Sequence, residues 1–200
     1  MAHFGFDIPY ERVRSQIGKG GDQLLPVFVP PDQLDRLKEA IEDYRGQLFK
    51  REYLSRVRAF PCVRELFERI HGDGHRIALA SSAASDEIAN YKNVANINGL
   101  TDADTSRDDV DCSKPCPDVF EVACERLGIE PGRALVFGDS PFDALAAKSA
   151  KLRSVGVLCG GFPEEQLREA GCVAIYAGPA DLLEHYEEIL RLFTPVPQTP

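Results

Sequence analysis

Apolar and polar residues follow two different patterns along this chain of 200 residues. Up to about Leu54, apolar positions recur every three or four residues, which is typical of helices that pack on one side. The clearest example follows Pro30-Pro31 and has a charged opposite face. Its apolar positions are Leu34, Leu37, Ile41, Tyr44 and Leu48. The pattern predicts a small all-helical cap over residues 1–55, with Asp7 capping a first helix that ends near Ile17.

From about Val57, short apolar runs alternate with amphipathic stretches. Strands are predicted at 77–80, 135–138, 154–158 and 172–176, with helices near 61–71, 86–92, 118–127, 141–150 and 182–192. Strands separated by helices indicate a parallel sheet with right-handed crossovers. We therefore expect an α/β fold, with a three-layer Rossmann-like core over residues 56–193. The proline-rich residues 194–200 are expected to form a disordered tail.

The composition excludes several classes of function. The formal net charge is −9 and the pI is about 5.0, which argues against a protein that binds the nucleic-acid backbone. No run is long and apolar enough for a transmembrane helix, and the first residues lack the features of a signal peptide. The sequence therefore predicts a cytoplasmic protein without a membrane or nucleic-acid partner. It carries no signal for the oligomeric state.

The six cysteines are expected to be reduced thiols. They form no Cys-x-x-Cys pair. Cys112 and Cys116 lie four residues apart, but no histidine cluster stands near them to complete a zinc site. Reduced thiols are the usual state of cysteines in a cytoplasmic protein.

The most informative stretch is an apolar run that ends at Gly138-Asp139 and is followed by Asp143. The run indicates a buried strand, Ser140 can cap the next helix, and Pro141 suits its first turn. Asp139 and Asp143 then lie together at the carboxyl edge of the sheet, where two carboxylates suit a hard divalent cation. An acidic surface turn is the alternative interpretation.

Two further signals accompany this acidic pair. Ser81 and Ser82 directly follow a predicted strand, and a hydroxyl with free backbone N–H groups at a helix start forms an anion site. Lys114 stands in a loop that two prolines stiffen. A cation and a hydroxyl opposite metal-binding carboxylates are typical of phosphate transfer. Each signal alone is equally compatible with turn chemistry or a solvated lysine.

The order of these signals resembles the haloacid dehalogenase-like (HAD) superfamily of phosphohydrolases. That family has a strand-end Ser or Thr, then a Lys often followed by Pro-x-Pro-Asp, then Gly-Asp-x-x-x-Asp. The corresponding positions here are Ser81, Lys114 with Pro115-Cys116-Pro117-Asp118, and Gly138-Asp139 with Asp143. The helical segment is similar to the mobile cap of the subgroup that contains phosphoglycolate phosphatase and β-phosphoglucomutase. The resemblance covers essentially the whole chain.

The resemblance implies a role for each matching residue. Ser81 and the backbone of Ser82 would hold the phosphoryl oxygens of a small phosphorylated metabolite. Lys114 would neutralise the charge of the phosphate and of the nucleophile. Asp139 would ligate Mg²⁺, and Asp143 would ligate the ion or orient its waters.

The glycine-rich stretch Gly18-Lys19-Gly20-Gly21 would form the cap loop that closes over the site. Lys19 would be its substrate contact, although a lysine between glycines is equally compatible with a solvated side chain. No other feature of the cap indicates which metabolite is bound.

The first motif of the family is absent. It places Asp-x-Asp-Gly-Thr at the end of the first strand, where the first Asp forms an aspartyl-phosphate and the second acts as general acid and base. Phe6-Asp7-Ile8-Pro9 is not a degenerate copy, because no apolar strand precedes Asp7 and Pro9 replaces the second Asp. An amino-terminally truncated copy is the favoured interpretation. A natural remnant that binds without catalysing is the alternative.

The missing strand has a structural consequence. In this family it lies between the strands that end at Ser81 and at Asp139, so these two must pair directly, leave a gap or recruit another segment. Each unpaired buried backbone group would cost about 1–3 kcal/mol, against a total stability of roughly 5–15 kcal/mol. The chain alone is therefore expected to be marginally stable or prone to aggregation.

The resulting functional prediction is a hydrolase, a Mg²⁺-dependent phosphatase that acts through an aspartyl-phosphate when the first motif is present. One alternative is a catalytically inactive phosphate-binding or regulatory module. A phosphomutase is another, but it needs an acid or base in the cap that the sequence does not identify. Dehalogenase chemistry is disfavoured because the acidic pair indicates a metal.

Overall fold

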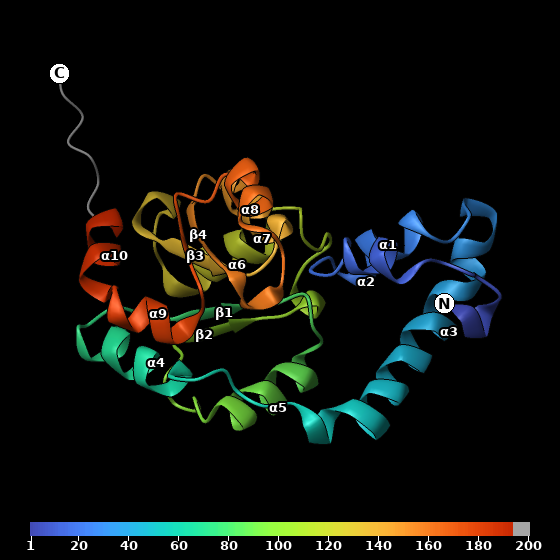
Figure 1. Cartoon of the computed structure of the whole chain (residues 1–200), viewed down its shortest axis with the longest axis horizontal. Helices are drawn as coiled ribbons and strands as arrows, with labels where there is room; N and C mark the ends of the chain where they lie inside the picture. The colour runs from blue at the N-terminus through green and yellow to red at the C-terminus, as the bar shows by residue number, and fades with distance from the viewer. Residues whose placement is uncertain (194–200) are drawn as a thin grey trace.

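The computed structural model describes residues 1–193 and contains a helical lobe and an α/β lobe (Figure 1). Residues 194–200, the predicted disordered tail, lie outside the described residues. The helices of the first lobe are η1 (Ala2–Phe4), α1 (Tyr10–Arg14), α2 (Gly21–Leu24), η2 (Leu25–Val27) and α3 (Pro31–Leu48). A π-helical turn, η3 (Phe49–Tyr53), and a 3-10 turn, η4 (Leu54–Arg56), continue α3 toward the α/β lobe.

The helical lobe has a small core of its own. Leu25, Val29 and Ile41 are buried, and Leu34 and Leu37 pack against them. Leu34, Leu37 and Ile41 confirm this part of the predicted apolar stripe of α3, whereas Tyr44 is 37% exposed. The helix begins at its proline because a missing N–H and a fixed φ suit the first helical turn.

The start of α1 differs from the prediction. Its N-cap residue is Pro9, and no side chain caps the helix, so the assignment of Asp7 as the cap was wrong. The proline ring holds φ at −56° with ψ at 138°, which keeps the backbone extended until Tyr10. The helix ends at Arg14, three residues before the predicted end at Ile17.

The α/β lobe alternates strands with helices, as the pattern predicts. Its strands are β1 (Ala78–Ala80), β2 (Ala103–Thr105), β3 (Leu135–Gly138), β4 (Arg153–Val157) and β5 (Ala174–Tyr176). Its α-helices are α4 (Val63–Gly72), α5 (Ser85–Ala95), α6 (Asp118–Leu127), α7 (Pro141–Ser149), α8 (Glu164–Ala170), α9 (Pro179–Glu184) and α10 (Tyr186–Phe193). The sequence pattern missed β2 and α8, and the predicted last helix is two helices divided at His185.

The helices cover both faces of the strands, which confirms the three-layer α/β arrangement (Figure 1). On one face α6 and α7 pack on β3, with Val119, Phe120 and Val136 in the shared core. On the other face α4, α9 and α10 pack on β4, with Val155 and Leu182 at the centre. In the part of the chain that the structure describes, no helix combines the length and apolarity that crossing a membrane requires.

The strands form two parallel sheets instead of one. β1 pairs with β2, and β3 pairs with β4, which pairs with β5. Among residues 1–193 no ladder joins β1 to β3. Direct pairing of the strands that end at Ser81 and at Asp139 is therefore not observed among the described residues.

Candidate active site

Lys114 joins the two sheets at their carboxyl ends. Its Nζ donates to the carbonyl oxygen of Ala80, the last residue of β1, at 2.9 Å. It also donates to Oδ1 of Asp143, in the first turn of α7, at 2.7 Å. The side chains of this ion pair are only 11% and 9% exposed. The lysine is thus buried between the ends of β1 and β3, where sequence analysis placed the phosphate site.

Asp143 is fixed by the start of α7. Ser140 is the N-cap, and its backbone N and Oγ donate to Asp143 Oδ2 at 3.0 and 2.6 Å. The predicted cap is therefore confirmed, with Pro141 in the first turn. A Cβ at Gly138 would lie 2.3 Å from the Cβ of Asp143, so this close approach requires glycine. Both carboxylate oxygens of Asp143 are engaged within the protein.

Asp139 offers a carboxylate without such partners. Within residues 1–193 no other residue donates a hydrogen bond to its side chain. Although the residue is exposed, its Oδ2 lies close to the backbone of Gly160, where a Cβ would approach it to 2.6 Å. Desolvation of the carboxylate by the protein around it raises its pKa, the charge of Asp143 raises it further, and Lys114 opposes both effects.

These two carboxylates fit a magnesium ion. A carboxylate that lacks a hydrogen-bond donor and stands beside a second negative charge is stabilised by a divalent cation. Mg²⁺ is typically held by one or two carboxylates and retains several waters. Asp139 would be the direct ligand, and the hydrogen bonds of Asp143 suit an orienting role.

Ser81 and Ser82 follow β1 directly. The backbone N of Ser81 donates to the carbonyl oxygen of Thr105, and its Oγ accepts a hydrogen bond from the backbone N of Ala83 at 3.1 Å. The Oγ of Ser82 is buried and has no hydrogen-bond partner among the described residues. A buried hydroxyl without a partner indicates a place where a ligand or water completes the hydrogen bonding.

The glycine-rich cap loop contacts the site. At Gly18, where φ is +110°, a Cβ would lie 2.5 Å from Ser140 Oγ, and at Gly20 a Cβ would lie 2.2 Å from Ser113 Oγ. Lys19 Nζ lies 4.9 Å from the centroid of the Phe142 ring. The loop therefore packs on both segments that carry the buried ion pair.

Two residues of the helical lobe that no sequence motif marks, Arg14 and Asp22, contact this region. Arg14 Nη2 donates to the carbonyl oxygen of Gly161 at 2.7 Å, and its guanidinium lies 5.8 Å from the Phe162 ring centroid. Asp22 Oδ2 accepts a hydrogen bond from the backbone N of Ser113 at 3.0 Å. Their partners are 147 and 91 residues away in the chain, so no local pattern marks them.

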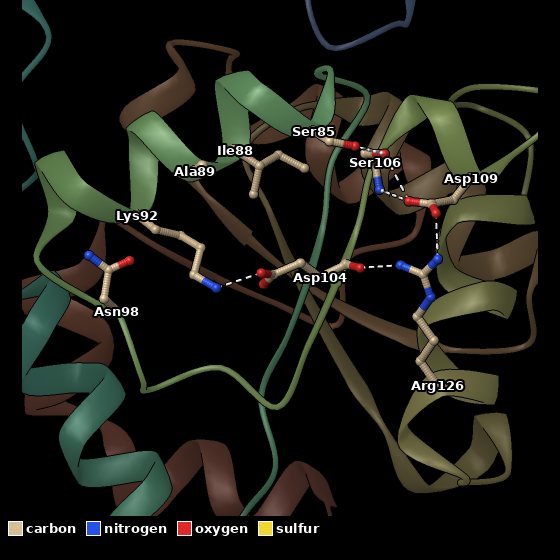
Figure 2. Close-up of a pocket in the computed structure, with 9 residues that line it drawn as sticks. All are labelled: Ser85, Ile88, Ala89, Lys92, Asn98, Asp104, Ser106, Asp109 and Arg126. Atoms are coloured by element: carbon tan, nitrogen blue, oxygen red, sulfur yellow. Dashed lines mark hydrogen bonds and ion pairs between the residues drawn. The ribbon is translucent and has the colours of Figure 1, made fainter.

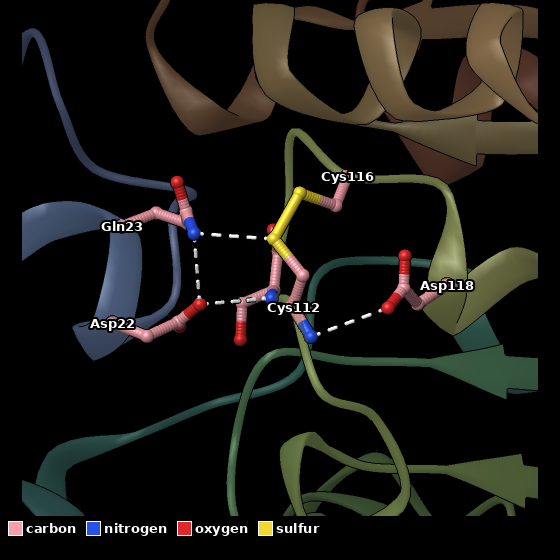
Figure 3. The surroundings of a disulfide bond; sticks show 6 residues. Asp22, Gln23, Cys112, Cys116 and Asp118 are labelled. Carbon is pink, nitrogen blue, oxygen red and sulfur yellow. Dashed lines mark hydrogen bonds between the residues drawn. A yellow bond between two sulfur atoms is a disulfide. The ribbon is translucent and has the colours of Figure 1, made fainter.

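The loop before Lys114 contains a disulfide between Cys112 and Cys116 (Figure 3). The expectation of six reduced thiols was therefore wrong for these two, whereas Cys62, Cys124, Cys159 and Cys172 are free. The segment turns back on itself, because the backbone N of Cys116 donates to the carbonyl oxygen of Ser113. The turn leaves the two Cα atoms 5.8 Å apart, a separation that suits a disulfide.

A cavity of about 310 Å³ lies beside the outer edge of β2 and contains none of the predicted site residues (Figure 2). Lys92 pairs with Asp104 there, and Arg126 pairs with Asp109. The hydrogen bond from Arg126, supported by Ser106, lowers the pKa of Asp109 to about 2. The four charged side chains of this cavity form two ion pairs, whereas Asp139 of the Lys114 site has no ion-pair partner among the described residues.

Comparisons with known proteins identify relatives of this chain. The pattern of the family described as haloacid dehalogenase-like hydrolase matches residues 1–157. A phosphoglycolate phosphatase of Nitrosospira multiformis is 30% identical over 84% of this chain and 76% of its own length. A phosphorylated carbohydrates phosphatase of Thermotoga maritima is 28% identical over 77% of this chain and 73% of its own. The crystal structure of a hydrolase from Pseudomonas syringae has a TM-score of 0.82 at 29% identity, covering 94% of this chain and 87% of that one.

Proposed function

Because this chain belongs to the haloacid dehalogenase-like hydrolase family, we propose that its Lys114 site binds the phosphoryl group of a small phosphorylated metabolite. The named relatives are phosphatases, and this relationship supports a phosphatase or phosphomutase function. The single observation that carries the proposal is the buried Lys114–Asp143 pair, which brings together the loops after β1 and β3. We prefer the phosphatase function.

Each side chain of the site has a part in this proposal. Lys114 opposes the negative charge of the phosphoryl group, and the hydroxyls of Ser81 and Ser82 donate to its oxygens. The buried Ser82 Oγ supports this, because it lacks a partner within residues 1–193. Asp139 would hold Mg²⁺, with Asp143 orienting its shell. When bound, the ion supplies positive charge opposite the transferring group.

The cap side chains favour a phosphatase over a phosphomutase. Asp22 is the cap carboxylate that contacts the lysine loop. Burial alone would raise the pKa of Asp22, but hydrogen bonds from Ser113 and Gln23 outweigh burial and lower it. A carboxyl group with a lowered pKa is a poor general acid near neutral pH. Lys19, on the closing loop, instead suits contact with an anionic substrate.

We also propose that the nucleophile is an aspartate on a further strand between β1 and β3, which forms an aspartyl-phosphate. The gap between the two sheets supports this, since the facing backbone edges of β1 and β3 have no ladder partner among the described residues. Residues before Met1, ending in Asp-x-Asp, would supply such a strand. In this interpretation the 200-residue chain is a truncated copy.

Two measurements test the proposal. Calorimetry with inorganic phosphate on the 200-residue protein should show binding that Lys114→Met abolishes and that the exposed control Lys50→Met retains. Added residues that form an apolar strand ending in Asp-x-Asp should give hydrolysis of p-nitrophenyl phosphate, and Asn at the first Asp or Asp139→Asn should abolish it. Failure of the extended protein to hydrolyse any phosphate ester would contradict the phosphatase function.

A non-catalytic phosphate-binding module is the second candidate. It is supported by the arrangement of Ser82, Lys114 and Asp143 in a sequence without the Asp-x-Asp-Gly-Thr motif. Phosphate binding by the chain, together with no turnover by the extended protein, would select this function. Absence of phosphate binding in both proteins would contradict both candidates.

A further inference from the structure

We propose that Cys112 and Cys116 form a reversible thiol–disulfide exchange site whose redox state sets the position of the Lys114 loop. The bond joins residues four apart and therefore encloses three, with Lys114 in the middle. This lysine is the residue that contacts Ala80 and Asp143 across the two sheets. The proposal goes beyond the phosphatase function and does not depend on it.

The disulfide is expected to constrain the loop around Lys114 more than it stabilises the whole protein. The conformational entropy that a cross-link removes from the unfolded chain grows with the number of residues enclosed, and three is very few. Its main effect is to fix the direction in which the Lys114 side chain leaves the backbone. Lys114 Nζ contacts Asp143 at 2.7 Å in a buried position, so a loop movement larger than the lysine side chain can follow would break that contact.

The surroundings of the two sulfurs favour exchange. Cys112 and Cys116 are both partly exposed, whereas Cys124 is buried. Gln23 of α2 points its side-chain amide at the bond and donates from Nε2 to Cys112 Sγ at 3.2 Å (Figure 3). A donor at this sulfur stabilises a thiolate on Cys112, which makes Cys112 the better leaving group. The attacked sulfur is therefore that of Cys116.

The partner in this exchange is a low-molecular-weight thiol of the glutathione class. Its thiolate attacks Cys116 Sγ, the S–S bond breaks, and the electron pair passes to Cys112 Sγ, which takes up a proton. A second thiol then attacks the mixed disulfide and releases the small disulfide, leaving Cys116 as a thiol. The net reaction converts one protein disulfide and two small thiols into two protein thiols and one small disulfide. The reverse reaction restores the bond.

The same loop carries contacts to the helical lobe. Asp22 accepts a hydrogen bond from the backbone N of Ser113, which lies inside the disulfide ring. Gly20 also approaches Ser113, since a Cβ there would lie 2.2 Å from its Oγ. Reduction is therefore expected to loosen the contact between the lobes as well as the position of Lys114.

The first experiment measures the redox state. The protein is equilibrated in mixtures of reduced and oxidised glutathione, free thiols are alkylated, and the peptides are weighed by mass spectrometry. Cys112 and Cys116 should convert together and reversibly across the mixtures, while Cys124 stays a thiol. A pair that remains in one state in every mixture would overturn the proposal.

The variant Gln23→Ala tests the direction of attack. Its disulfide should be reduced at least about threefold more slowly, because the leaving thiolate of Cys112 loses its hydrogen-bond donor. The exposed cap glutamine Gln47 provides the control, and Gln47→Ala should match the unmodified protein. Equal reduction rates for both variants would contradict the assigned order of attack.

The second experiment measures the coupling to Lys114, by amide hydrogen exchange of the oxidised and reduced protein. Reduction should speed exchange in residues 111–118 and 20–25 and leave β4 unchanged. The double variant Cys112→Ser/Cys116→Ser should exchange like the reduced protein under both conditions. Identical exchange in the two redox states would overturn the coupling. This readout needs no phosphate, so a failure of the proposed function would not affect it.

Discussion

Both sheets of the α/β lobe are parallel, but their strands differ strongly in burial. In β4, which has a strand on each side, four of five residues are buried. In β3, which has one neighbour, one of four is buried, and Phe137 is 40% exposed. In β1 none of three is buried. Helices cover both faces of the strands. The side chains of a strand without a neighbour on one side therefore stay partly accessible to solvent even between two layers of helices.

Lys114 compensates in part for this gap. It is the residue whose side chain contacts both the end of β1 and the first turn after β3. Changing this link, the packing of each sheet and the cap contact one at a time therefore tests why the two sheets differ in burial.

Loss of Lys114 should have the largest effect. Lys114→Ala leaves Asp143 buried without its cation and should lower the free energy of unfolding by about 3–5 kcal/mol. The control is Lys50→Ala, which removes an ion pair of the same length, 2.7 Å, in an exposed position. That pair should contribute little measurable stability. Urea unfolding compares the two variants, and equal losses would show that the link between the sheets is unimportant.

Two leucine substitutions test the packing of each sheet. Leu167 of α8 is fully buried in the three-stranded half, and Leu167→Ala should cost about 2–5 kcal/mol. Leu79 of β1 is only partly buried, so Leu79→Ala should cost less than half as much. Denaturant titrations measure both losses. A larger loss at Leu79 would mean that the β1–β2 pair is the better-packed half.

The same comparison explains what the sequence could predict. The sequence pattern predicts β3 and β4 because each contains a short apolar run, which is a local signal of a strand. The three residues of β2, Ala-Asp-Thr, contain no such run, and pairing with β1 makes them a strand. The motifs containing Ser81, Lys114 and Asp139 mark strand ends and loops, and the structure brings these segments together. Their roles in phosphate and metal binding stay predictions.

Other features depend on contacts that a local pattern does not contain. Arg14 and Asp22 contact the α/β lobe only because the helical lobe folds over it. The disulfide of Cys112 depends on a turn in the loop, which the spacing to Cys116 does not reveal. Asp7 is a residue type that often caps helices, which led to its assignment as the cap. In the structure the N-cap position is occupied by Pro9.

The packing of the cap loop against the Lys114 segment can be tested by substituting Gly20. Gly20→Ala places a Cβ within 2.2 Å of Ser113 Oγ, so the loop must move away from the Lys114 segment. We expect a larger radius of gyration by small-angle X-ray scattering. Gly46 lies in α3, where a Cβ would meet no neighbouring atom within 4 Å, so Gly46→Ala should keep the radius and add about 0.5–1 kcal/mol of stability. An unchanged radius in Gly20→Ala would contradict close packing of the loop.

The smallest effect is expected at Asp109, at the outer edge of the β1–β2 pair. Arg126 and Ser106 lower its pKa from 3.8 to about 2. A carboxyl group whose pKa is lower in the folded state adds stability above its unfolded pKa, and this stability is lost as pH falls. Asp109→Asn should therefore be less stable than the unmodified protein at pH 6, and the difference should shrink between pH 4 and 2. Urea midpoints at each pH measure it, and a constant difference would mean that neutral hydrogen bonds, not the ion pair, hold this edge.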